Sequence, residues 1–177
     1  MTISGIAVLP RTDELIDAIA HAVSAGPPED PQLRTAERVA TVLRRFLHQP
    51  DLLTPDQQEP DPAHYRQHVL YVAPAARFSL VALVWLPGQR TPIHDHISWC
   101  VAGTYRGCEE ETTYRAESGA LVPVATSLNP VGAVSALAPP GDIHRVRNGG
   151  AELAISIHVY GADVLDSGSS IRRCYSR

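Results

Sequence analysis

The stretch FSLVALVWLPGQRTPIHDHISWCVAGTYRG, residues 78–107, combines two β-prone runs with a pair of histidines two positions apart. FSLVALVWL (78–86) and WCVAGTYRG (99–107) are rich in β-branched and aromatic residues, and proline and glycine lie between them. In an extended chain alternate side chains share a face, so His94 and His96 project to the same side. The stretch therefore predicts a β-rich fold that carries a candidate metal site.

Further short β-prone runs follow, separated by glycine, proline and asparagine: EEETTYR (109–115), ALVPVAT (120–126) and ELAISIHVYG (152–161). Their spacing leaves no room for crossover helices between parallel strands. It favours a sandwich or a small antiparallel barrel.

Two amphipathic segments precede the β-prone region. Residues 12–25 have an apolar stripe at helical spacing, with Thr12 as the expected cap. Residues 31–48 predict a second helix, with Asp30 as cap and Pro31 at the first helical position. The side chains of this helix expected to face inward are those of Leu33, Ala36, Val39, Ala40, Leu43 and Leu47.

The chain thus divides into three parts: a helical segment with a connecting loop (1–63), a β-barrel (64–162) and an irregular C-terminal tail (163–177). With 177 residues, 44% of them hydrophobic, one globular domain is expected. A net charge of -4 without a basic block argues against nucleic acid or an anionic membrane as a partner. The first ten residues lack a positively charged leader, and their apolar run is too short for a signal peptide. The three cysteines are an odd set without zinc-site spacing, so free thiols in a reducing cytoplasm are expected.

A pair of histidines alone is a weak metal signal, because such a pair also occurs by chance in loops. The later segment PPGDIHRVRN (139–148) adds a third, His144, within the pattern PxGxxHxxxN. Together the two segments resemble the two motifs of the cupin superfamily, a small antiparallel β-barrel with two N-terminal helices packed against it in this chain. The resemblance implies that His94, His96 and His144 hold a metal ion. Cys100 stands where the first cupin motif usually has a glutamate ligand.

Three neutral imidazoles suit either zinc or iron(II), so the ligand set alone leaves the metal open. The run ELAISIHVYG adds a second feature. Ser156, His158 and Tyr160 alternate along one face of the predicted strand, opposite an apolar face. If that face points into the barrel, serine, histidine and tyrosine can form a hydrogen-bonded row that orients the phenol near the metal.

This combination resembles the thiol dioxygenases, the cysteine dioxygenase-like cupins. They are iron(II) enzymes that add both atoms of O2 to a thiol and give a sulfinate. The resemblance implies Fe(II) at His94, His96 and His144, and a second-sphere triad of Ser156, His158 and Tyr160. It implies a small-molecule thiol and O2 as the reaction partners.

The substrate is less well determined. In cysteine-specific members an arginine two residues after a tyrosine binds the substrate carboxylate, and here that position is Gln67. The chain therefore resembles the glutamine-bearing group, which includes 3-mercaptopropionate dioxygenases, in which a C-terminal arginine takes over. Arg172 and Arg173 are the candidates, although a solvated tail is an alternative reading of both. 3-Mercaptopropionate is the first expectation, followed by cysteine or a bulkier thiol such as ergothioneine.

Trp99 and Cys100 each have two possible roles. Trp99 is a candidate for the mouth of the pocket, or it packs in the core. Cys100 occupies the position of the cysteine that forms a thioether with the active-site tyrosine in animal members, whereas many bacterial members carry glycine. Both a Cys100–Tyr160 thioether and a buried free thiol are therefore open.

Two other functions compete with thiol oxidation. One is another metal-dependent cupin enzyme, such as a zinc or manganese isomerase or a dioxygenase acting on carbon. The other is a non-catalytic cupin that binds a metal or a small ligand. Neither needs the row formed by Ser156, His158 and Tyr160.

Overall fold

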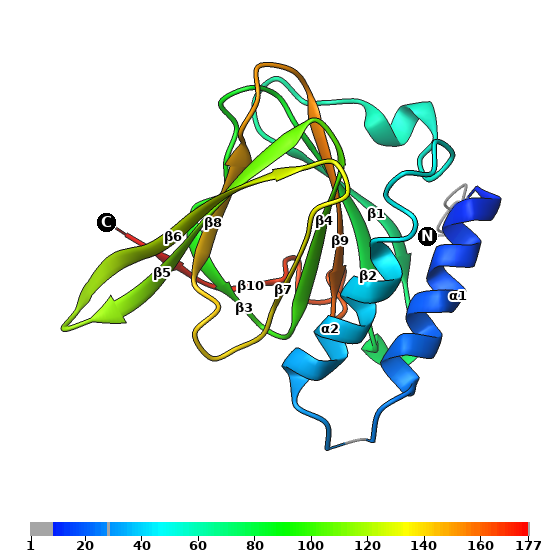
Figure 1. Ribbon diagram of the computed structural model, residues 1–177, viewed down its shortest axis with the longest axis horizontal. Helices are drawn as coiled ribbons and strands as arrows, with labels where there is room; N and C mark the ends of the chain where they lie inside the picture. The colour runs from blue at the N-terminus through cyan, green and yellow to red at the C-terminus, as the bar shows by residue number, and fades with distance from the viewer. Residues whose placement is uncertain (1–8, 28, 177) are drawn as a thin grey trace.

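The computed structural model describes residues 9–27 and 29–176, and within them the fold is mainly β. Two antiparallel five-stranded sheets face one another, and two helices lie against the outside of one sheet (Figure 1). The first sheet has the order β1 (Arg66–Val72), β2 (Ser79–Trp85), β9 (Ala154–Tyr160), β4 (Cys100–Arg106) and β7 (Val134–Leu137). The second has the order β10 (Ile171–Tyr175), β3 (Ile93–His96), β8 (His144–Asn148), β5 (Cys108–Glu117) and β6 (Ala120–Pro130).

This architecture confirms the predicted fold class. Each of the five β-prone runs forms a strand, with boundaries that differ by a few residues from those expected. In β9 the expected alternation is present: Ile155, Ile157 and Val159 pack toward the helices, and the side chains between them point between the sheets.

The helices are α1 (Pro10–Ser24) and α2 (Gln32–Leu43). Their apolar stripes, which include Leu15, Ile19 and Leu43, form one buried cluster with the outer face of the first sheet. A smaller cluster that includes Val81 and Val146 fills the space between the two sheets. Among the described residues, neither helix is long and apolar enough to cross a lipid bilayer.

Several details of the helix prediction are wrong. The first helix begins at Pro10, so Thr12 lies inside its first turn, where its hydroxyl donates to the Leu52 carbonyl (2.5 Å) instead of capping. The second helix starts one residue later than predicted, with Pro31 as its N-cap, and it ends at Leu43. Leu33, expected to face inward, is 45% exposed.

Asp30 also does not cap the second helix. Its carboxylate accepts a hydrogen bond from the Arg38 guanidinium (2.5 Å), which ties the end of the interhelical loop to the middle of α2. Leu47, expected to face inward from the helix, is buried in the turn that follows α2.

The C-terminal segment is not the irregular tail that was expected. Residues Ile171–Tyr175 form strand β10, which pairs with β3 at the edge of the second sheet. IRRCY is short and has two adjacent arginines at its centre, so the sequence pattern did not predict a strand there. Its place in the sheet depends on pairing with β3, which is a tertiary interaction. The segment thereby becomes the direct neighbour of the strand that carries His94 and His96.

Gly107 sits at the turn between β4 and β5, and the backbone there requires glycine. Its φ is +73°, and a Cβ atom would lie 2.8 Å from the Leu153 carbonyl oxygen. We expect Gly107→Ala to lower the free energy of unfolding by about 2–4 kcal/mol, through the left-handed backbone and the clash together. Urea unfolding measures this.

Gly119→Ala is the matched control, because Gly119 also has a left-handed backbone (φ +84°) but open space where the Cβ would be. We expect Gly119→Ala to lower the free energy of unfolding by only about 1 kcal/mol. If both variants lowered the free energy of unfolding equally, the contact between the added Cβ at Gly107 and the Leu153 carbonyl would make no contribution.

Candidate metal centre

Three buried histidines meet between the two sheets. His94 and His96 project from the same face of β3, and His144 begins β8 directly opposite His94 in the register of the two strands. The ring centroids are 4.6–4.9 Å apart. One ligand atom from each ring lies within 4.8 Å of the others, so the group can hold a metal ion.

In each of the three rings the Nδ1 atom has a protein partner. His94 Nδ1 is 3.0 Å from the Pro92 carbonyl oxygen, His96 Nδ1 is 3.0 Å from an Asp142 carboxylate oxygen, and His144 Nδ1 is 2.6 Å from a Glu111 carboxylate oxygen. Because these partners accept hydrogen bonds, the proton of each neutral ring belongs on Nδ1 and the Nε2 lone pair is free.

The free lone pairs face one another. His144 Nε2 and His94 Nε2 are 3.2 Å apart, an arrangement of two acceptors that needs a positive charge between them. Burial, together with the neighbouring His144, lowers the pKa of His94 to about 3, and burial lowers the pKa of His96 as well. Both rings are therefore neutral at physiological pH, the state in which imidazole binds metal.

Sequence reasoning missed the two carboxylates that hold these rings. Burial alone would raise the pKa of Glu111, but its hydrogen bond with His144 and its other polar contacts together lower it, and His96 does the same for Asp142. Both carboxylates are therefore ionised and orient their histidines. The available signal was Asp142 two residues before His144, and Glu111 within the acidic run of a predicted strand.

The predicted polar row is present on β9. Ser156 Oγ is 2.8 Å from His158 Nε2, and His158 Nδ1 is 3.0 Å from the Tyr160 hydroxyl. The Trp85 indole N–H donates to Ser156 Oγ (3.1 Å) and anchors the inner end of the row. Burial lowers the pKa of His158 to about 3 and raises that of Tyr160 well above 10, so both are neutral. The outer end of the row, Tyr160, lies beside His96, with ring centroids 6.0 Å apart.

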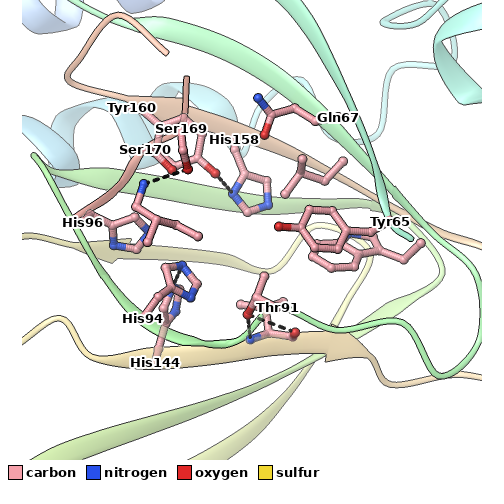
Figure 2. Close-up of a pocket in the computed structure, with 14 residues that line it drawn as sticks. Tyr65, Gln67, Thr91, His94, His96, His144, His158, Tyr160, Ser169 and Ser170 are labelled. Carbon is pink, nitrogen blue, oxygen red and sulfur yellow. Dashed lines mark hydrogen bonds between the residues drawn. The ribbon is translucent and has the colours of Figure 1, made fainter. Parts of the chain in front are cut away.

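One cavity is lined by the three histidines and by two members of the row, His158 and Tyr160, as Figure 2 shows. Besides His94, His96, His144, His158 and Tyr160, its polar lining residues are Tyr65, Gln67, Thr91, Ser169 and Ser170. Its apolar lining residues are Leu83, Trp85, Val146 and Ile171. Gln67, predicted from the sequence, comes from β1, whereas Ser169 and Ser170 come from the loop before β10.

The structure does not bring the other predicted substrate residues to this cavity. Trp99 is buried in the cluster between the first sheet and the helices. It therefore packs in the core, the second of the two roles considered for it, and does not line the mouth of the pocket. The Arg172 guanidinium donates to the Asp95 carboxylate (2.5 Å), and Arg173 lies over the Tyr175 ring, 5.4 Å from its centroid. Asp95 points away from His94 and His96, because it alternates with them on β3.

Cys100 is buried and lies directly opposite Tyr160 in the pairing of β4 with β9. It is not part of the three-histidine group within the described residues. Burial raises the pKa of its thiol well above the usual value. The thioether between Cys100 and Tyr160 stays a prediction, since the structure shows a free thiol with the tyrosine as its cross-strand neighbour.

Glu109 is a further buried carboxyl group between the sheets, near Ser156 and Trp85. Its Oε1 atom has no hydrogen-bond partner within the described residues. Burial raises its pKa from 4.5 to about 7, although contacts with Ser156 and Trp85 oppose the rise. The folded protein therefore binds this proton more tightly than the unfolded chain.

We expect this carboxyl to lower the free energy of unfolding as pH rises from 4.5 to 7, by about 3 kcal/mol at about 1.4 kcal/mol per pH unit. Glu109→Gln should flatten that part of the stability curve, measured by urea unfolding at a series of pH values. Glu110→Gln is the control, because Glu110 faces outward and pairs with Arg147. Parallel curves for Glu109→Gln and wild type would contradict the buried protonated carboxyl.

No known family profile matches the sequence. Similar solved structures include an RmlC-like cupin protein from Desulfovibrio desulfuricans (20% identity, 58% of this chain and 88% of that chain, TM-score 0.43). Another is a cupin 2 conserved barrel domain protein from Salinispora arenicola (24%, 66% and 90%, TM-score 0.43). A third is oxalate decarboxylase from Bacillus subtilis (18%, TM-score 0.47), where the match covers 64% of this chain and 32% of that enzyme. Similarity at this level concerns the barrel and carries no information about metal or substrate.

Proposed function

We propose that this protein is an iron(II)-dependent thiol dioxygenase that adds both atoms of O2 to the sulfur of a small thiol. The overall change is RSH + O2 → RSO2H, in which sulfur is oxidised and dioxygen is reduced. The observation that supports it best is the shared cavity, which is lined both by three converging imidazoles and by a buried phenol. The phenol is hydrogen-bonded to His158, which Ser156 in turn holds.

The three imidazoles fit an open metal site. His94, His96 and His144 would hold the ion through Nε2, because Nδ1 of each ring is occupied by a protein acceptor. The three direct ligands are neutral, so a substrate thiolate can join them as an anionic ligand of the divalent ion. When bound, iron(II) would supply the redox chemistry that joins dioxygen to the thiolate sulfur.

The row on β9 would supply a proton to the reaction and then restore it. Tyr160 carries its proton at physiological pH, and His158 is neutral with one ring nitrogen free to accept. A proton that leaves the Tyr160 hydroxyl toward the reacting centre can be replaced from His158, which in turn exchanges with Ser156. Trp85 restricts the Ser156 hydroxyl by donating to its oxygen, so the row keeps its geometry.

This row favours thiol oxidation over the competing functions. A cupin that only stores a metal would gain nothing from a phenol oriented by two further buried polar groups. Most other metal-dependent cupin enzymes keep the glutamate ligand of the first motif, and Cys100 stands in its place here. The row ends with the Tyr160 hydroxyl in the cavity that the three histidines also line, where it can hold and transfer a proton.

The test is anaerobic loading with iron(II), followed by oxygen-electrode traces with 3-mercaptopropionate, cysteine, ergothioneine and uncharged small thiols. We expect one O2 to be consumed per thiol, with a sulfinate as product. Retained iron without oxygen consumption for any thiol would favour a binding protein. Activity only with zinc or manganese would favour another cupin enzyme.

A further inference from the structure

The cavity beside the three histidines has an uncharged lining. Its polar groups other than histidine are phenols, hydroxyls and the Gln67 amide, and neither lysine nor arginine is among the lining residues that the structure describes. Gln67 is exposed and Tyr65, Ser169 and Ser170 are half-buried, so a carboxylate at this end of the cavity would lose part of its hydration. It would meet no side-chain cation among the lining residues in return, which costs free energy. The described lining residues therefore offer a thiol carboxylate no positively charged side chain.

The C-terminal arginines cannot supply that charge from where they lie. Arg172 is engaged by Asp95 through Nη2, and Asp95 also accepts a hydrogen bond from the Tyr175 hydroxyl (2.7 Å). This network lies on the outer side of β3, opposite His94 and His96. Moving Arg172 into the cavity would leave the buried Asp95 carboxylate, 1% exposed, without its cation.

The groups that do line the cavity suit a neutral tail. Gln67 offers an amide donor and an acceptor, and Ser169 and Ser170 come from the loop on the side of β10 (Figure 2). The rings of Tyr65 and Trp85 are stacked, with centroids 4.5 Å apart, and form an apolar wall of the cavity. The Tyr65 hydroxyl adds a polar group to that wall. Hydrogen-bonding groups and an aromatic wall together match a small amide or alcohol.

Resting on the thiol dioxygenase function proposed above, we infer that the site takes thiols with an uncharged, hydrogen-bonding tail in preference to thiol carboxylates. The thiolate would occupy the position beside His94, His96 and His144. The tail would lie among Gln67, Ser169 and Tyr65. This replaces 3-mercaptopropionate, the substrate first expected from the sequence, with its uncharged counterparts.

The sharpest test compares 3-mercaptopropanamide with 3-mercaptopropionate, which have nearly the same shape and differ by one charge. Binding is measured without turnover, by titrating each thiol into the cobalt(II)-loaded protein under nitrogen and following the sulfur-to-cobalt absorption. We expect the amide to bind about tenfold more tightly, because the acid loses part of its hydration without gaining a side-chain cation. Equal or tighter binding of the acid would overturn the inference.

A charge-swap variant tests the lining itself. Gln67→Arg places a guanidinium at the cavity. It should therefore reverse the order of the two affinities, so that the acid binds about tenfold more tightly than the amide. Arg173→Gln is the matched control, because Arg173 lies on the outside and should leave the ranking unchanged. Loss of acid binding in Arg173→Gln would place a C-terminal arginine in the cavity and contradict the inference.

The two proposals can fail separately. If the cobalt protein prefers the amide but the iron protein consumes no oxygen with it, the thiol preference stands and the dioxygenase function fails. If oxygen is consumed with the acid at least as efficiently as with the amide, the function stands and the preference is wrong. If neither thiol binds to the metal-loaded protein, both are wrong.

Discussion

Replacing His144 with alanine is expected to remove bound iron and thiol-dependent oxygen consumption together. His144 Nε2 lies 3.2 Å from His94 Nε2, and without this ring only His94 and His96 remain to hold the ion. Two imidazoles bind a divalent ion weakly, so we expect activity to fall by roughly a hundredfold or more. Metal analysis after dialysis and the oxygen electrode measure the two effects.

The variant also removes the hydrogen-bond partner of buried Glu111, so folding needs its own control. His144→Gln can keep a donor within reach of Glu111 and should lose iron just as His144→Ala does. His64→Ala changes an exposed histidine and should retain both iron and activity. A folded His144→Ala protein with full iron content would contradict the three-histidine site.

Tyr160→Phe is expected to keep the iron but slow turnover, by about ten- to a thousandfold. The phenol is not one of the three converging ligands, so metal binding should be unaffected. Phenylalanine keeps the ring beside His96 but removes the hydroxyl bonded to His158, and with it the proton that we assign to the reaction. Iron content and kcat with the best thiol measure the two parts.

Tyr114→Phe is the matched control, because Tyr114 is also buried but packs in a separate cluster with Ile93 and Ile143. Its hydroxyl has no hydrogen-bond partner among the described residues, so its removal should change neither kcat nor iron content. Unchanged turnover in Tyr160→Phe would remove the phenol from the mechanism.

Much of the fold could be predicted because the strands with strong patterns are those that a core requires. In β9 the alternation between the helix-covered face and the interior is visible in the sequence. β2 is a continuous apolar run, the pattern of a strand buried on both faces. β10 carries no such pattern, because its place depends on pairing with β3 and on the contact of Arg172 with Asp95. Such contacts join residues far apart in the chain, and local propensity does not encode them.

The candidate site shows the same division. His94 and His96, and the row on β9, lie at alternate positions of one strand, so spacing predicted which of these side chains share a face. The place of His144 beside them was implied only by the resemblance to cupins, because it depends on the pairing of β3 with β8. Glu111 could not be assigned, because its partner His144 is 33 residues away and the register of β5 with β8 decides the contact. The substrate arginines were misplaced for a similar reason: a bulged strand turned them to the outer side.

The most direct test of the account is the fate of labelled dioxygen. The iron-loaded protein is supplied with 18O2 and its preferred thiol, and the product is analysed by mass spectrometry. We predict a sulfinate in which both oxygen atoms carry the label. A disulfide as the product, or a sulfinate whose oxygen comes from water, would contradict thiol dioxygenation at the three-histidine centre.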